Sequence, residues 1–111
     1  MRPSLRRQSS RPHPITAVLS VSHNANKKYD VRIGSKTVSF GARGMSDFTL
    51  HKDPLRKERY IDRHQKRENW KESGIRSAGF WSRWLLWNLP SLQASAKDLE
   101  KRFGVRVVAS A

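Results

Sequence analysis

The sequence predicts an α+β fold, with an N-terminal antiparallel β-hairpin or meander followed by three α-helices. Two observations lead to this prediction. Apolar and polar residues alternate between residues 15 and 40, which is typical of half-buried strands. After residue 50 the apolar residues recur at helical spacing, and each run is preceded by a residue that caps helices. We expect one small domain over residues 15–108, preceded by a basic disordered tail at residues 1–14.

The strands are predicted from three short runs. The first is ITAVLSVS at residues 15–22, which is rich in β-branched residues. In YDVRIG, residues 29–34, Tyr29, Val31 and Ile33 fall on one side. In SKTVSFG, residues 35–41, Val38 and Phe40 alternate with Thr37 and Ser39. Gly34 and Ser35 separate the second and third runs, and a Gly-Ser pair at this place indicates a tight hairpin turn.

The three helices are predicted from their caps and their ends. Asp53 and Pro54 suit the N-cap and first position of a helix over residues 53–67. Ser77 is the predicted cap of a second helix, residues 78–88, which should end before Pro90. Ser91 is the predicted cap of a third, which ends at Gly104 and is followed by a short strand at residues 105–108.

The charge of the chain indicates a polyanionic partner. Its 23 Lys and Arg residues exceed its 9 acids by 14, and the isoelectric point is near 11.3. Nucleic acid is the default partner of such a domain, with anionic membrane surfaces and acidic proteins as alternatives. No apolar run approaches the roughly 20 residues of a transmembrane helix. The tail could instead be an organelle transit peptide, but three prolines argue against its amphipathic helix: Pro3, Pro12 and Pro14.

The first predicted helix has two unlike faces. Tyr60 and Ile61 are expected to pack inward, and five cations fall within about 100° of one another on the helical wheel. These cations are Arg56, Arg59, Arg63, Lys66 and Arg67. Together with Arg6, Arg7 and Arg11 of the tail, they form the predicted nucleic-acid-binding residues, directed at phosphates rather than bases. The alternative is a solvated face held by local ion pairs.

The second predicted helix carries three of the four tryptophans, Trp81, Trp84 and Trp87. Three hypotheses account for them: a hydrophobic core, a platform on which bases stack, or a face that lies in a membrane interface. The core is favoured because the chain has few other large apolar residues. Trp84 lies in the middle of the apolar face and is expected to be the most buried of the three, whereas Leu86 falls on the other side of the wheel.

No catalytic, metal or cofactor site is predicted. The chain lacks cysteine, and its four histidines are not spaced like the ligands of a structural zinc site. The segment GARG at residues 41–44 lacks the phosphate-loop pattern. Tyr60, Arg63 and His64 could form a nucleophilic site for phosphodiester chemistry, but packing of Tyr60 against His64 one turn later explains the spacing equally well.

Two long segments resemble a known family. They are KKYDVRIGSKTVSFGARGMSDFTLHKDPLRKERYIDRH, residues 27–64, and ENWKESGIRSAGFWSRWLLWNLPSLQASAKDLEKRFGV, residues 68–105. The family consists of small basic proteins of large DNA viruses of algae and amoebae and is described as a domain of unknown function. Leu55 and Leu89 depart from its pattern, which has polar or charged residues there. The resemblance implies a viral origin and a compact α+β domain, and it carries over no catalytic residue.

We therefore expect a small basic, non-enzymatic, virus-encoded protein that binds nucleic acid without sequence specificity or is associated with the virion. Its expected location is the virion or the interior of the host cell, in cytoplasm, nucleus or viral factory. One alternative is a minor capsid or internal scaffold protein that binds acidic protein partners. Another is a small nucleic-acid-processing enzyme, which would show a pocket with acids beside His51, His64 or Tyr60.

Overall fold

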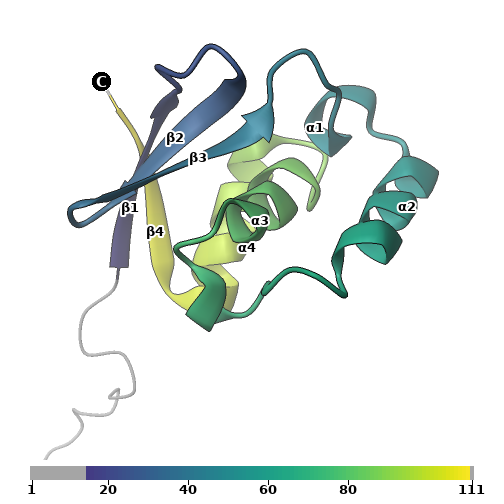
Figure 1. The fold of residues 1–111 in the computed structure, drawn as a ribbon. Helices are drawn as coiled ribbons and strands as arrows, with labels where there is room; N and C mark the ends of the chain where they lie inside the picture. Colours follow the sequence, from purple (N-terminus) through teal and green to yellow (C-terminus); the bar gives the residue numbers. More distant parts are fainter. Residues whose placement is uncertain (1–14, 111) are drawn as a thin grey trace, which may run out of the picture.

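The computed structural model describes residues 15–110, so the predicted tail and its arginines lie outside the described residues. Four strands form one sheet in the order β3-β2-β1-β4. The helices α3 and α4 lie against one face of this sheet, and α2 stands to the side of them (Figure 1). The elements are β1 (Ile15–Val21), β2 (Lys27–Ile33), β3 (Lys36–Ala42), α1 (Phe48–His51), α2 (Pro54–His64), η2 (Glu72–Gly74), α3 (Ala78–Trp81), η3 (Ser82–Leu86), α4 (Leu92–Phe103) and β4 (Val105–Ala109). The α+β class is confirmed.

The predicted hairpin is confirmed as β2 and β3. Ile33 pairs with Lys36, which leaves Gly34 and Ser35 as a two-residue loop. Gly34 has a φ of 61°, a conformation that glycine adopts without steric cost, as the first position of such turns requires. Val31 and Phe40 are fully buried, as the alternation predicts.

The short last strand is also confirmed, but the sequence pattern does not reveal its partner. β4 pairs with β1 in parallel, with Ile15 opposite Val105, so that β1 is an inner strand of a mixed sheet. The strand is positioned by the end of α4. Gly104 takes a φ of 70° there, and its N–H donates to the Glu100 carbonyl. Val105 is fully buried as a result of this pairing.

The helix caps are confirmed, whereas some helix boundaries differ from the prediction. The side chains of Asp53, Ser77 and Ser91 each accept an N–H of the first turn of α2, α3 and α4. α2 ends at His64 rather than at residue 67, and the N–H of Arg67 donates to the His64 carbonyl three residues earlier, which is a tighter turn than that of an α-helix. The short helices α1 and η2 were not predicted from the sequence.

The second predicted helix begins as α3 and continues as the π-helical turn η3. The N–H of Trp87 donates to the Ser82 carbonyl five residues earlier. This wider turn buries three consecutive residues, Trp84, Leu85 and Leu86. The prediction that Leu86 lies away from the apolar face is therefore wrong: Leu86 is 2% exposed. A uniform α-helical wheel does not allow for the altered turn.

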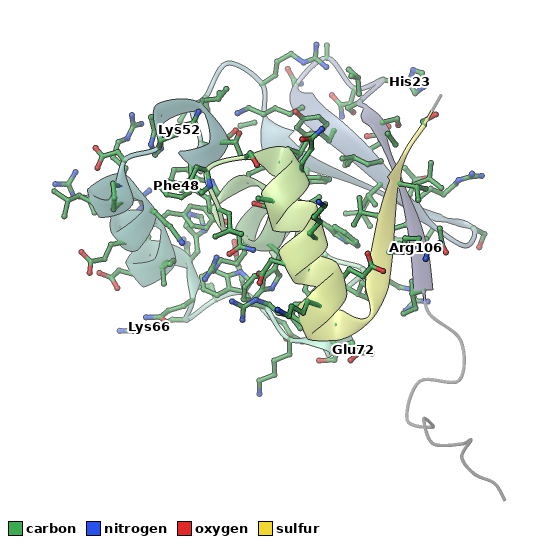
Figure 2. The ribbon with its side chains drawn as sticks, turned by 180° about the vertical axis from the view of Figure 1, so that it is seen from behind. His23, Phe48, Lys52, Lys66, Glu72 and Arg106 are labelled. Atoms are coloured by element: carbon green, nitrogen blue, oxygen red, sulfur yellow. The ribbon has the colours of Figure 1, made fainter. Side chains whose placement is uncertain are left out.

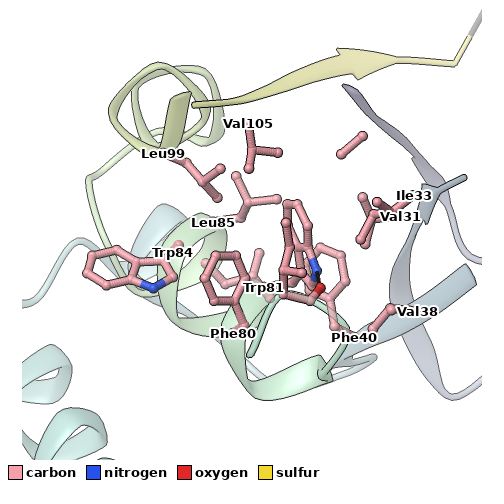
Figure 3. Close-up of a cluster of buried hydrophobic side chains, with 13 residues drawn as sticks. Val31, Ile33, Val38, Phe40, Phe80, Trp81, Trp84, Leu85, Leu99 and Val105 are labelled. Atoms are coloured by element: carbon pink, nitrogen blue, oxygen red, sulfur yellow. Dashed lines mark hydrogen bonds between the residues drawn. The ribbon is translucent and has the colours of Figure 1, made fainter. Parts of the chain in front are cut away.

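The tryptophan helix forms the core, but Trp81 and not Trp84 is its most buried tryptophan. Trp81 is 0% exposed and Trp84 9%. In Figure 3, Trp81 and Phe80 lie between the side chains of the sheet and the helices, while Trp84 lies at the margin of the cluster. The indole N–H of Trp81 donates to the Ile75 carbonyl at 2.6 Å, which satisfies its polar group inside the core.

Candidate nucleic-acid interface

A column of rings attaches α2 to the core. The Tyr60 ring lies between His64, at a centroid distance of 4.3 Å, and Trp87, at 4.4 Å. Trp87 in turn lies 5.3 Å from the ring of His51. Tyr60 is 6% exposed, which confirms its predicted inward position, whereas Ile61 is only half-buried. These contacts determine which side of α2 is turned toward solvent.

Asp47 positions α1 and therefore the start of α2. It is 2% exposed, and its carboxylate accepts the N–H of Thr49 at 2.9 Å as the N-cap of α1. The same carboxylate forms an ion pair with Lys28 of β2. A carboxylate buried to this degree is costly unless it is paired. The pair joins the sheet to the segment that precedes α2.

Three of the predicted phosphate-binding residues share one exposed face of α2. Arg56, Arg59 and Arg63 are exposed and, with the edge of Trp87, line a depression of about 170 Å³. No ion pair between described residues involves any of the three arginines. A guanidinium without a carboxylate partner is available to a phosphate.

The other two predicted cations of the helix do not share this face, because α2 ends before it reaches them. Lys66 and Arg67 are exposed but lie in the turn that follows the helix. Figure 2 shows Lys66 at the end of α2, pointing away from the sheet. Arg67 instead lines a second hollow, of about 430 Å³, together with Arg76. Arg6, Arg7 and Arg11 lie outside the described residues.

A groove of about 380 Å³ separates α2 from the ends of β2 and β3. Arg63 and His64 line its α2 side, and Lys27 and Lys28 line its sheet side. We call it the α2 groove. Lys27, Lys28 and Arg76 were not predicted as binding residues, because a lysine in a strand and an arginine in a loop carry no local signal of a shared surface.

The tryptophans have little free surface for bases or lipids. Trp81 is fully buried, and the Trp84 ring is covered by the guanidinium groups of Arg83 at 4.3 Å and Arg102 at 4.7 Å. Tyr60 covers one face of Trp87. The geometry therefore favours contacts with phosphates over stacking on tryptophan. Within residues 15–110 no helix is long and apolar enough to cross a bilayer.

Two further cations act inside the fold rather than on its surface. Lys57 donates to the Asn88 carbonyl at 2.6 Å, and Arg83 donates to the Trp87 carbonyl at 2.8 Å. Burial lowers the pKa of both side chains, and neighbouring arginines lower it further. Each cation donates a hydrogen bond to a backbone carbonyl at the end of the π-helical turn. The last carbonyls of a helix have no N–H partner within the helix and therefore accept such bonds. They stabilise the connection between α2 and the core.

Tyr60 and His64 do not have the geometry of a nucleophile and its base. His64 stacks on the phenol ring, and its Nδ1 lies 2.9 Å from Glu68 Oε2. Glu68 also accepts the indole N–H of Trp70 at 2.9 Å. Burial raises the pKa of Tyr60 well above its ordinary value, which disfavours the phenolate. Within the part of the chain that the structure describes, no three His, Asp or Glu side chains gather as metal ligands.

The comparisons with known proteins give one match. No curated protein and no solved structure matches the chain significantly. Residues 17–64 match a model described as a family of unknown function, DUF5754. The matched segment runs from β1 to the end of α2 and thus contains Arg56, Arg59 and Arg63, as well as Lys27 and Lys28 on the opposite side of the groove. Over this segment the chain is similar to a domain family without an assigned activity.

Proposed function

We propose that this is a small basic, non-enzymatic protein that binds nucleic acid through its phosphates, without base specificity. The observation that carries the proposal is the exposed face of α2 with Arg56, Arg59 and Arg63, none of which pairs with a described carboxylate. The net charge of +14 adds a long-range attraction to polyanions. Cations that approach a phosphate backbone release its counterions, which is the main source of nonspecific affinity.

The resemblance to proteins of large DNA viruses supports a viral origin and a role in the virion or in the host cell interior. A basic protein that binds DNA or RNA irrespective of sequence suits the packaging or protection of a viral genome. Mass spectrometry of purified particles tests this part of the proposal. If the protein is absent from particles but present in infected cells, its role is restricted to the cell interior.

The test of binding is a salt titration of fluorescence anisotropy with unrelated DNA sequences. Reversing Arg59 and Arg63 to glutamate should weaken binding equally for all sequences. It should also make the log–log salt slope shallower by about 0.9 for each phosphate of duplex DNA that the variant no longer neutralises. The matched control reverses Arg32 and Lys36, which are exposed on the sheet. This control changes the net charge by the same amount, but at a site far from α2. It should retain most of the affinity for nucleic acid.

Each outcome of the titration has a definite reading. An unchanged slope in the Arg59 and Arg63 variant, with weaker binding by a chain that lacks residues 1–14, would place the contact on Arg6, Arg7 and Arg11. No binding of any nucleic acid at low salt would remove nucleic acid as the partner. The alternative of a scaffold protein that binds acidic protein partners would then be favoured, because the same cations suit carboxylates.

A second candidate function rests on the pair formed by His64 and Glu68. Both residues line the α2 groove, and a histidine oriented by a carboxylate is a common general base. A small nucleic-acid-processing enzyme is the corresponding activity. Labelled RNA and DNA that are cleaved by the parent protein and not by a His64→Ala variant would establish it. Intact substrates after prolonged incubation with Mg²⁺ or Mn²⁺ would leave binding alone.

A further inference from the structure

The α2 groove shares lining residues with two neighbouring hollows. It shares Glu68 and Gly79 with the hollow that Arg67 and Arg76 line. It shares Arg63 and Trp87 with the depression beside the arginines of α2. The three hollows are therefore neighbours, from the loop before α3 to the exposed face of α2.

Cations lie on both sides of the α2 groove. Arg63 stands on the α2 side, and Lys27 stands on the sheet side. Lys28 also lines the sheet side, but its ammonium group is engaged in the ion pair with Asp47. No ion pair between described residues involves Lys27 or Arg63. An extended polyanion in the groove would thus meet a free cation on each wall.

The carboxylates of the groove are both engaged. Asp47 accepts from Lys28 and Thr49, and Glu68 accepts from Trp70 and lies against His64. These contacts compensate part of the negative charge that would repel a phosphate. The lining between the cations includes the half-buried apolar residues Ala78 and Trp87. It therefore combines cationic rims with an apolar floor.

We infer, on the basis of the proposed function, that the preferred ligand is a single-stranded nucleic acid lying in the α2 groove. A single strand can place its backbone against Lys27 and Arg63 while its unpaired bases contact the apolar floor. Proteins that bind single strands without sequence preference commonly combine a cationic groove with aromatic rings that contact the bases, and Trp87 is a half-buried ring in the lining of this groove. A duplex hides the faces of its bases in its own stack and meets mainly the exposed arginines of α2.

The test compares a labelled oligo-dT of about 12 nucleotides, within the roughly 4–16 nucleotides that single-strand-binding OB-fold domains cover, with a duplex of equal length. The decisive variant is Lys27→Glu. Its matched control is Lys36→Glu, which removes the same charge at the opposite end of the hairpin, outside the groove. Both variants are made in the full chain, and thermal melting verifies that each is folded.

The single strand should bind the parent more tightly than the duplex at the same salt concentration. Lys27→Glu should weaken binding of the single strand about fivefold or more and that of the duplex less than about twofold, while Lys36→Glu changes both by less than about twofold. Equal or tighter binding of the duplex would overturn the inference and leave the proposed function standing, as would equal effects of the two lysine variants. No binding of either nucleic acid at low salt would instead refute the proposed function itself.

Discussion

The rings of Trp87 and Tyr60 lie parallel to each other, with centroids 4.4 Å apart and planes inclined by 2°. Trp87 follows the π-helical turn at the centre of the domain, and Tyr60 belongs to α2. The stack thus connects the core to the helix that carries the exposed arginines. With the Lys57 contact to the Asn88 carbonyl, it determines the orientation of α2 and of the groove beside it.

Removal of the Tyr60 ring should destabilise the domain. We expect Tyr60→Ala to lower the free energy of unfolding by about 3 kcal/mol, because it removes a buried aromatic side chain that stacks on three other rings. Tyr60→Phe is the control, and it should stay within about 1 kcal/mol of the parent because it keeps the ring. Urea denaturation followed by tryptophan fluorescence measures both. Equal stability of the alanine variant and the parent would show that α2 is held by other interactions.

The different burial of Trp81 and Trp84 leads to a ranking of their variants. Trp81→Ala should cost about 4–5 kcal/mol and Trp84→Ala less, because Trp84 lies at the margin, between two guanidinium groups. Trp81→Phe keeps an aromatic ring but leaves the Ile75 carbonyl without its donor, and should still cost about 1–3 kcal/mol. Thermal and urea unfolding give the order. A Trp84 variant less stable than the Trp81 variant would contradict it.

Gly74 should tolerate no side chain. A Cβ at this position would lie 2.1 Å from the backbone oxygen of Asn69, and a backbone atom cannot move aside as a flexible side chain does. We expect Gly74→Ala to lower stability by more than about 2 kcal/mol. Gly34→Ala meets no neighbouring atom and should cost only the strain of its positive φ, about 1 kcal/mol. Calorimetry of the two variants tests the difference.

The carboxyl group of Asp30 should add a pH-dependent contribution to stability. Hydrogen bonds at 2.6 Å from the hydroxyls of Ser22 and Ser39 lower its pKa below the ordinary 3.8. A folded-state pKa below the unfolded value stabilises the protein above that unfolded value. This stability is lost as the pH falls through the lowered pKa.

The matched variants for this effect are Ser22→Ala with Ser39→Ala, and Ser35→Ala as the control in the exposed turn. The double variant should lose stability at neutral pH and show a weaker decline below about pH 4, because the Asp30 pKa moves back toward 3.8. The control should follow the parent at every pH. Parallel curves for the double variant and the parent would refute the assigned cause. Urea unfolding at several pH values provides the curves.

Local chemistry accounts for the elements that the sequence predicted correctly. The alternation around Val31 and Phe40 requires only that one face of each strand be buried, and the turn at Gly34 requires only its own backbone. The caps at Asp53, Ser77 and Ser91 act within one helical turn. The inward face with Tyr60 and the outward arginines of α2 likewise follow from a single helical wheel.

The remaining features depend on contacts between residues far apart in the chain. The parallel pairing of β4 with β1 joins the two ends of the domain, and no local pattern specifies it. The π-helical turn, which buries Leu86 and leaves Trp84 at the margin, packs against α4 and β3, which lie far from it in the chain or follow it, so a local pattern does not specify it. The groove exists because α2 comes to lie opposite the end of β2, which sets Arg63 across from Lys27. The sequence by itself determined that the chain carries many cations, and only tertiary packing decided which of them share a surface.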